Sequence, residues 1–66
     1  MPVFIQNCTT LQFLMPGGGW TDQRDEALDF EETLRALSYI RSLGLRNVQI
    51  LLRFNRVDLD VILSPN

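Results

Sequence analysis

The stretch that decides the fold runs from residue 48 to residue 63 and reads VQILLRFNRVDLDVIL. Large apolar residues alternate with mostly polar ones on each side of Asn55–Arg56, a pattern typical of two strands that share one buried face. A two-residue turn at Asn55–Arg56 places Phe54 opposite Val57, Leu52 opposite Leu59, Ile50 opposite Val61 and, on the other face, Arg53 opposite Asp58. The sequence therefore predicts a C-terminal β-hairpin that supplies the centre of the core.

The turn chemistry leaves a longer connection open. Asn55 suits the first position of a type I′ turn, whereas Arg56 occupies a position where glycine is preferred. The outer face of the hairpin carries Leu51 and Ile62 among polar residues. We expect this face to be solvated or half-buried by a partner.

Residues 3–15 are rich in β-branched and aromatic side chains, which favour strands. We expect two short strands at about 3–6 and 10–15, joined as a hairpin; one long bulged strand is the competing interpretation. The run Pro16-Gly17-Gly18-Gly19 ends this segment. Because no lysine is present to reach a phosphate, the run is interpreted as a flexible turn and not as a phosphate loop.

A helix is predicted over about 31–43. On a helical wheel the apolar half contains Phe30, Thr33, Leu34, Ala36, Leu37, Ile40 and Leu43. Extending the helix backwards would put Glu26 and Asp29 on that half, so residues 26–30 are predicted to form a short strand instead. Gly44 is expected to end the helix in the left-handed conformation, with Leu45 making the accompanying apolar contact.

The element order is thus β-β-(β)-α-β-β in one domain of 66 residues. With one helix and four or five short strands, the fold class is α+β. The helix packs on one face of a small antiparallel sheet.

The composition argues against catalysis. All six basic residues are arginines, and the chain contains no lysine and no histidine, which excludes Ser-His, Cys-His and histidine–metal sites. We therefore expect no enzymatic activity, no cofactor and no metal. The paired Asp58 and Asp60 are interpreted as a solvated strand face, and Cys8 as a small buried or partly buried filler.

Cys8 is the single cysteine, so no internal disulfide can form. No basic leader precedes an apolar run at the start of the chain, and no apolar run is long enough to cross a membrane. These features predict a soluble cytoplasmic protein without membrane contact.

Charge order is the main functional signal. Residues 22–32 contain six acidic side chains against Arg24, whereas residues 33–57 contain five arginines and no acid. Two interpretations remain open: helix-dipole complementation on a solvated face, or an acidic patch that binds a basic surface of a protein partner. Direct nucleic-acid binding is not expected, because the net charge is −2. The candidate partner-binding residues are Trp20, Asp22, Asp25, Glu26 and Asp29, and Trp20 is either a core residue or an interface anchor.

Three features together resemble a pattern in small acidic accessory proteins of phages and mobile elements: Gly18-Gly19-Trp20-Thr21, Ala27-Leu28-Asp29-Phe30, and a following helix with Leu34 and Ala36. Some proteins of this kind inhibit host defence, including anti-CRISPR inhibitors. The resemblance implies a non-enzymatic binder of a nucleic-acid-handling complex. The alternative from another class is a structural or regulatory homodimer, assembled through an edge strand or the semi-apolar sheet face.

Overall fold

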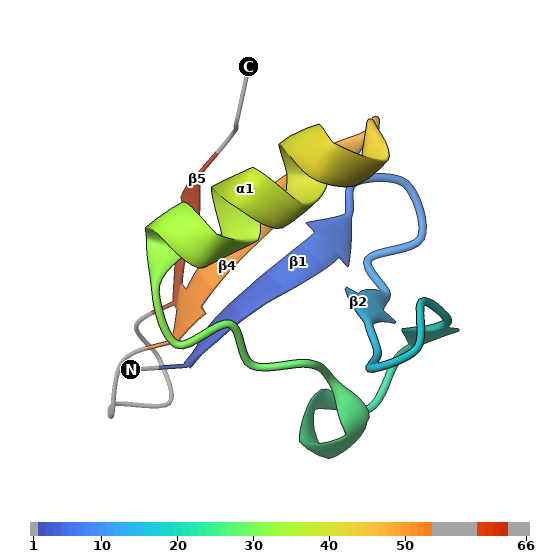
Figure 1. The fold of residues 1–66 in the computed structure, drawn as a ribbon. Coiled ribbons are helices and arrows are strands. Elements are labelled where there is room, and N and C mark those ends of the chain that lie inside the picture. Colours follow the sequence, from blue (N-terminus) through green and yellow to red (C-terminus); the bar gives the residue numbers. More distant parts are fainter. Residues whose placement is uncertain (1, 54–59, 64–66) are drawn as a thin grey trace.

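Five strands form a single sheet in the computed structural model, and helix α1 lies across one face of it (Figure 1). The structure describes residues 2–53 and 60–63. The elements are β1 (Val3–Asn7), β2 (Phe13–Leu14), β3 (Trp20–Thr21), the 3-10 helix η1 (Arg24–Glu26), α1 (Thr33–Leu43), β4 (Val48–Arg53) and β5 (Asp60–Leu63). The predicted α+β class is confirmed.

The strand order is β3-β2-β1-β4-β5, and every neighbouring pair is antiparallel. β1 is the central strand and pairs with β4 along its whole length, from Val3 opposite Leu52 to Asn7 opposite Val48. β1 also pairs with β2, which confirms the predicted N-terminal hairpin over the single bulged strand. Leu11 lies between the two strands and has a positive φ of 63°, so the backbone is not extended there. β2 is therefore shorter than the predicted strand at 10–15.

The larger core cluster lies between the sheet and α1. Its largest fully buried side chains are Val3, Ile5 and Ile50, each with at most 1% of its surface exposed. In β5, by contrast, Val61 and Leu63 keep 39% and 38% of their surface exposed. The centre of the core is therefore the β1–β4 pair and not the predicted C-terminal hairpin.

A second, smaller cluster lies on the opposite face of the sheet. It contains Phe4, Phe13 and Leu51, with Ala27 packed against it, and the rings of Phe4 and Phe13 meet edge to face at 5.7 Å. The expectation of a solvated or partner-covered outer face is therefore wrong at Leu51, because the chain buries this side chain itself. Ile62, on the same face of β5, is 55% exposed.

The C-terminal hairpin forms with a register two residues away from the predicted one. Ile50 lies opposite Leu63, Leu52 opposite Val61 and Arg53 opposite Asp60. Because strand side chains alternate with a period of two, an even shift keeps each residue on its predicted face while changing its partner. The predicted pairs that involve residues 54–59, and the turn itself, lie outside the described residues.

Helix α1 begins at Thr33, two residues after the predicted start, because Glu31 has a φ of +66° and Glu32 is extended. Its end is as predicted. Gly44 adopts the left-handed conformation, its N–H donates to the Arg41 carbonyl at 3.3 Å, and the Leu45 N–H donates to the Ile40 carbonyl at 3.0 Å. These two bonds define a Schellman motif.

The predicted strand at 26–30 is not formed. After η1 the chain is extended and makes single hydrogen bonds to the sheet, from Leu28 N–H to the Leu14 carbonyl and from Phe30 N–H to the Val3 carbonyl, each at 2.8 Å. Leu28 and Phe30 both pack in the larger core cluster, as alternate residues of an extended segment do when one side of it is buried.

Candidate protein-binding site

The acidic segment, residues 22–32, connects β3 to α1 and includes η1. In Figure 1 it is the green part of the chain that passes along the end of the sheet where β1 begins. The side chains of all six acids are exposed: Asp22, Asp25, Glu26, Asp29, Glu31 and Glu32. The segment between β3 and α1 thus exposes six acidic residues.

Asp29 has a structural role within this segment. Its Oδ1 accepts hydrogen bonds from the Val3 N–H at 2.9 Å and from the Glu31 N–H at 2.8 Å. The Val3 side chain is almost fully buried, so Asp29 ties the acidic segment to the beginning of the central strand. The carboxylate also stabilises the backbone beside Glu31, whose φ is positive.

Glu26 is held in a similar way at the other side of the segment. The Thr21 hydroxyl donates to Glu26 Oε1 at 2.8 Å and accepts from the Gln23 N–H at 3.0 Å. Thr21 is buried, with 7% of its surface exposed. Glu26 therefore fixes η1 against β3, and its substitution would disturb more than the surface charge.

The other acids are freer to meet a partner. Among the described residues, Asp22 accepts only from the exposed Gln23 side chain, at 3.0 Å. Glu32 lies 3.4 Å from Arg35 Nε, three residues further along the chain. Within residues 2–53 and 60–63, no hydrogen bond or ion pair engages the side chains of Asp25 and Glu31. Glu31 was not among the predicted contact residues, although it belongs to the same acidic run.

Trp20 is half-buried and packs against the larger core cluster from β3, opposite Leu14. The ring thus contributes to the core at the end of the sheet. The structure does not place Trp20 among the freely exposed carboxylates, although part of its surface remains accessible.

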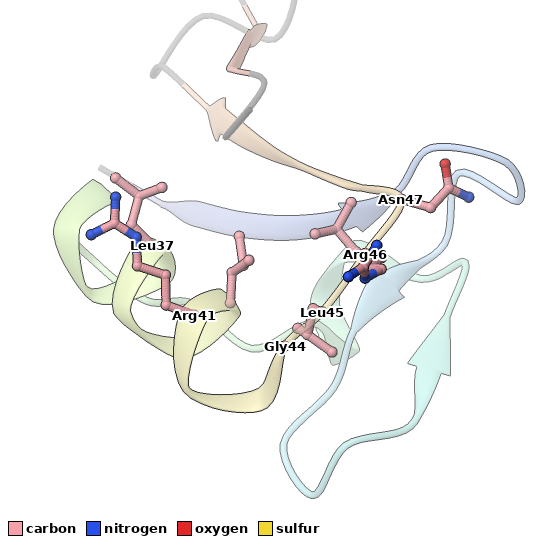
Figure 2. Close-up of a pocket in the computed structure, with 8 residues that line it drawn as sticks. Leu37, Arg41, Gly44, Leu45, Arg46 and Asn47 are labelled. Atoms are coloured by element: carbon pink, nitrogen blue, oxygen red, sulfur yellow. The ribbon is translucent and has the colours of Figure 1, made fainter.

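Arg41 and Arg46 lie at the C-terminal end of α1, whereas the acidic segment precedes the helix. Arg41 and Arg46 line a groove of about 550 Å³ together with the apolar side chains of Leu37, Ile40, Leu45 and Val48. Figure 2 shows the two guanidinium groups at opposite ends of this groove. The acids and these arginines are thus separated along the helix axis.

The remaining arginines lie elsewhere. Arg24 extends its guanidinium over the Phe13 ring, 5.6 Å from the ring centroid, on the sheet face away from α1. Arg53 lies at the same end of the sheet as the acidic segment, because its N–H donates to the Pro2 carbonyl at 3.0 Å. Arg56 lies outside the described residues.

Cys8 is exposed, contrary to the prediction of a buried filler. It lies in the turn after β1, where Asn7 Oδ1 accepts from the N–H groups of Thr9 and Thr10, and its thiol donates to Gln49 Oε1 at 3.6 Å. A turn with its own side-chain cap points Cys8 away from the core.

The residues that the structure describes contain no group of three or more His, Cys, Asp or Glu side chains arranged to hold a metal ion. Of the predicted strand carboxylates, Asp58 lies outside the described part of the chain, and Asp60 is placed by its backbone in β5. No helix among the described residues is long and apolar enough to cross a membrane.

The chain matches no protein-family model, no curated protein and no solved structure.

Proposed function

We propose that the chain is a non-enzymatic protein-binding module whose acidic segment binds a basic surface of another protein. The observation that carries this proposal is the exposure of all six carboxylates of residues 22–32. Their combined charge with Arg24 is −5, whereas the whole chain carries −2. A concentrated field of one sign raises the association rate with an oppositely charged surface and favours such partners over others.

Two acids support the same proposal by fixing the segment in place. Asp29 bonds to β1 and Glu26 bonds to Thr21, so the connection is anchored at both sides although it contains only one turn of 3-10 helix. A segment that is ordered before binding loses less conformational entropy when it binds. Asp22, Asp25 and Glu31 would then make the contacts, and Trp20 would add apolar area from its accessible part.

The resemblance to small phage and mobile-element proteins supports a finer form of the proposal. In that form the partner is a host complex that handles nucleic acid, and the carboxylates occupy an arginine- and lysine-lined channel in place of phosphates, as an anti-CRISPR type inhibitor would. We place this action in the cytoplasm. The direct test is to express the chain in bacteria with active CRISPR systems and to count plaques of a targeted phage. Restored plaque formation supports the inhibitor, and unchanged immunity across the systems tested contradicts this form.

A regulatory homodimer is the second candidate, and the edge of the sheet favours it. In the described part of the chain β5 pairs only with β4, and its Val61, Ile62 and Leu63 are 39%, 55% and 38% exposed. An exposed apolar edge strand can pair with another chain. Salt separates the two candidates, because contacts between exposed charges weaken as ionic strength rises and apolar contacts hardly change.

A further inference from the structure

The groove at the C-terminal end of α1 combines apolar and charged side chains, and the acidic segment takes no part in it. Its volume is about 550 Å³, within the range of about 300–1,000 Å³ that is usual for ligand sites. The apolar part of its lining consists of Leu37, Ile40, Leu45 and Val48. Ile40 and Val48 are buried, whereas Leu37 and Leu45 are half-buried and can contact an occupant.

Arg41 and Arg46 make this groove positive. Both residues are exposed, and no acidic residue is among those that line the groove. Among the described residues, no hydrogen bond or ion pair engages either guanidinium group. A guanidinium group matches the geometry of a carboxylate and can donate two parallel hydrogen bonds to it. The groove therefore offers two cationic side chains to an anionic occupant.

Stabilisation of the helix end does not account for Arg41. A basic side chain in the last turn of a helix stabilises it by lying near the free carbonyl groups. Figure 2 shows that the Arg41 side chain is instead directed back along the helix, with its guanidinium group beside Leu37. The carbonyl groups of Ile40 and Arg41 already accept from the N–H groups of Leu45 and Gly44. The position of Arg41 therefore serves the groove and not the helix end.

We propose that this groove binds an acidic peptide segment of another protein, one that carries an apolar side chain between two carboxylates. The two guanidinium groups lie at opposite ends of the groove (Figure 2), and the half-buried leucines belong to the same lining. Two carboxylates of the peptide pair with Arg41 and Arg46, and the apolar side chain between them covers Leu37 and Leu45. Charge complementarity selects an acidic occupant, and the apolar lining selects a peptide over an inorganic anion.

A nucleic-acid strand fits the groove less well than an acidic peptide. The chain carries a net charge of −2, which opposes the approach of a phosphate backbone. The lining also contains no aromatic side chain on which a base can stack.

The composition of the groove sets the strength of the contact. Exposed ion pairs contribute little each, and a single apolar side chain adds a small buried area. Binding is therefore weak and weakens further as salt rises. The acidic segment remains accessible, because none of its residues lines the groove.

Fluorescence anisotropy with short labelled peptides tests the proposal on the full chain. The probes contain two glutamates separated by one, two or three leucines, so that the series covers different spacings of the two carboxylates. Matched peptides carry serine in place of each leucine and keep both charges. The protein variant is Arg41→Gln/Arg46→Gln. Its control is Arg35→Gln, because Arg35 is exposed on the same helix but does not line this groove.

We expect the leucine peptide of best spacing to bind the wild-type chain and the Arg35→Gln variant within about twofold of each other. Its Kd should rise at least tenfold in the Arg41→Gln/Arg46→Gln variant, whose Tm stays that of the wild type, and at least threefold when serine replaces leucine in the peptide. Equal binding of the leucine and serine peptides would overturn the proposal, as would binding that does not depend on the two arginines.

Two further outcomes would also overturn the proposal. The first is the absence of binding to the wild-type chain at about 1 mM of every leucine peptide. The second is a salt-sensitive self-association of the wild-type chain that Arg41→Gln/Arg46→Gln abolishes, which would assign the groove to the acidic segment of a second copy.

Discussion

Replacement of Asp29 by alanine should destabilise the protein, although the side chain is exposed and belongs to the acidic segment. The carboxylate accepts two backbone hydrogen bonds, from Val3 and Glu31. The bond to Val3 is part-buried, so its N–H would lose its acceptor where water replaces it poorly, at a cost of about 1–3 kcal/mol. The bond to Glu31 is exposed, and water can replace the carboxylate there with little loss. We expect the free energy of unfolding to fall by about 2 kcal/mol in total.

Denaturation with urea and thermal unfolding measure this loss directly. In a domain of this size, 2 kcal/mol corresponds to a fall in Tm of about 8–16 °C. Asp29→Asn keeps one acceptor oxygen and should lose about half as much. The matched control is Asp25→Ala, which removes the same charge from an exposed side chain of the same segment and should change stability by less than about 0.5 kcal/mol.

Equal stability of the Asp29→Ala and Asp25→Ala variants would refute the reasoning. It would mean that the Asp29 carboxylate does not hold the segment to β1. Asp29 would then return to the set of residues that are free to contact a partner.

Three further results are expected. Ile50→Ala should cost about 2–5 kcal/mol in chemical denaturation because Ile50 is 1% exposed, whereas Ile62→Ala on the exposed edge strand should cost well below 1 kcal/mol; equal costs would contradict the placement of the core at β1 and β4. Gly44→Ala should lower stability by about 1–2 kcal/mol, since φ is +61° although space for a Cβ is open, and an unchanged midpoint would contradict the left-handed helix end. Cys8 should react with a thiol reagent in the folded protein as fast as in urea, and protection would show that it is buried.

The C-terminal hairpin shows how far a pattern of alternating residues can be taken. Alternation predicted the faces of β4 and β5 correctly, because the period of two is a property of each strand alone. It did not determine which residues pair, since a shift of two preserves every face. The poor fit of Arg56 to the second turn position was a sign against the predicted register, but it did not specify the observed pairing of Arg53 with Asp60.

The pattern of alternating residues did not predict the short and irregular segments correctly. β3 consists of Trp20 and Thr21 alone, and two residues cannot establish a period. Residues 27–30 alternate as a strand does, yet they join the sheet through single hydrogen bonds and form no ladder. Their extended conformation follows from burying Leu28 and Phe30, not from strand pairing.

For the acidic segment, too, one property could be predicted from the sequence and another could not. Its exposure follows from composition, because six acids in eleven residues cannot be buried together. The structural roles of Glu26 and Asp29 depend on tertiary contacts, and Asp29 bonds to a residue 26 positions away. The residues near Glu26 and Asp29 in the sequence do not predict such contacts, so these two acids could not be distinguished from Asp22 and Asp25.

The central claim is that carboxylates of the acidic segment bind a basic partner. The variant to measure is Asp22→Lys/Asp25→Lys/Glu31→Lys, because it reverses three charges and leaves the bonds of Glu26 and Asp29 intact. The control is Arg41→Glu/Arg46→Glu, which alters charge at the opposite end of α1.

The decisive measurement uses a partner protein that is captured from host lysate on the wild-type chain and then purified. The Kd for this partner is measured for the wild-type chain, the triple variant and the control, each at about 0.05 M and 0.5 M salt. We expect the triple variant to bind more than tenfold more weakly with unchanged Tm, the control to bind within about twofold of wild type, and the wild-type Kd to rise steeply with salt. An affinity that neither the triple reversal nor salt alters would contradict the claim.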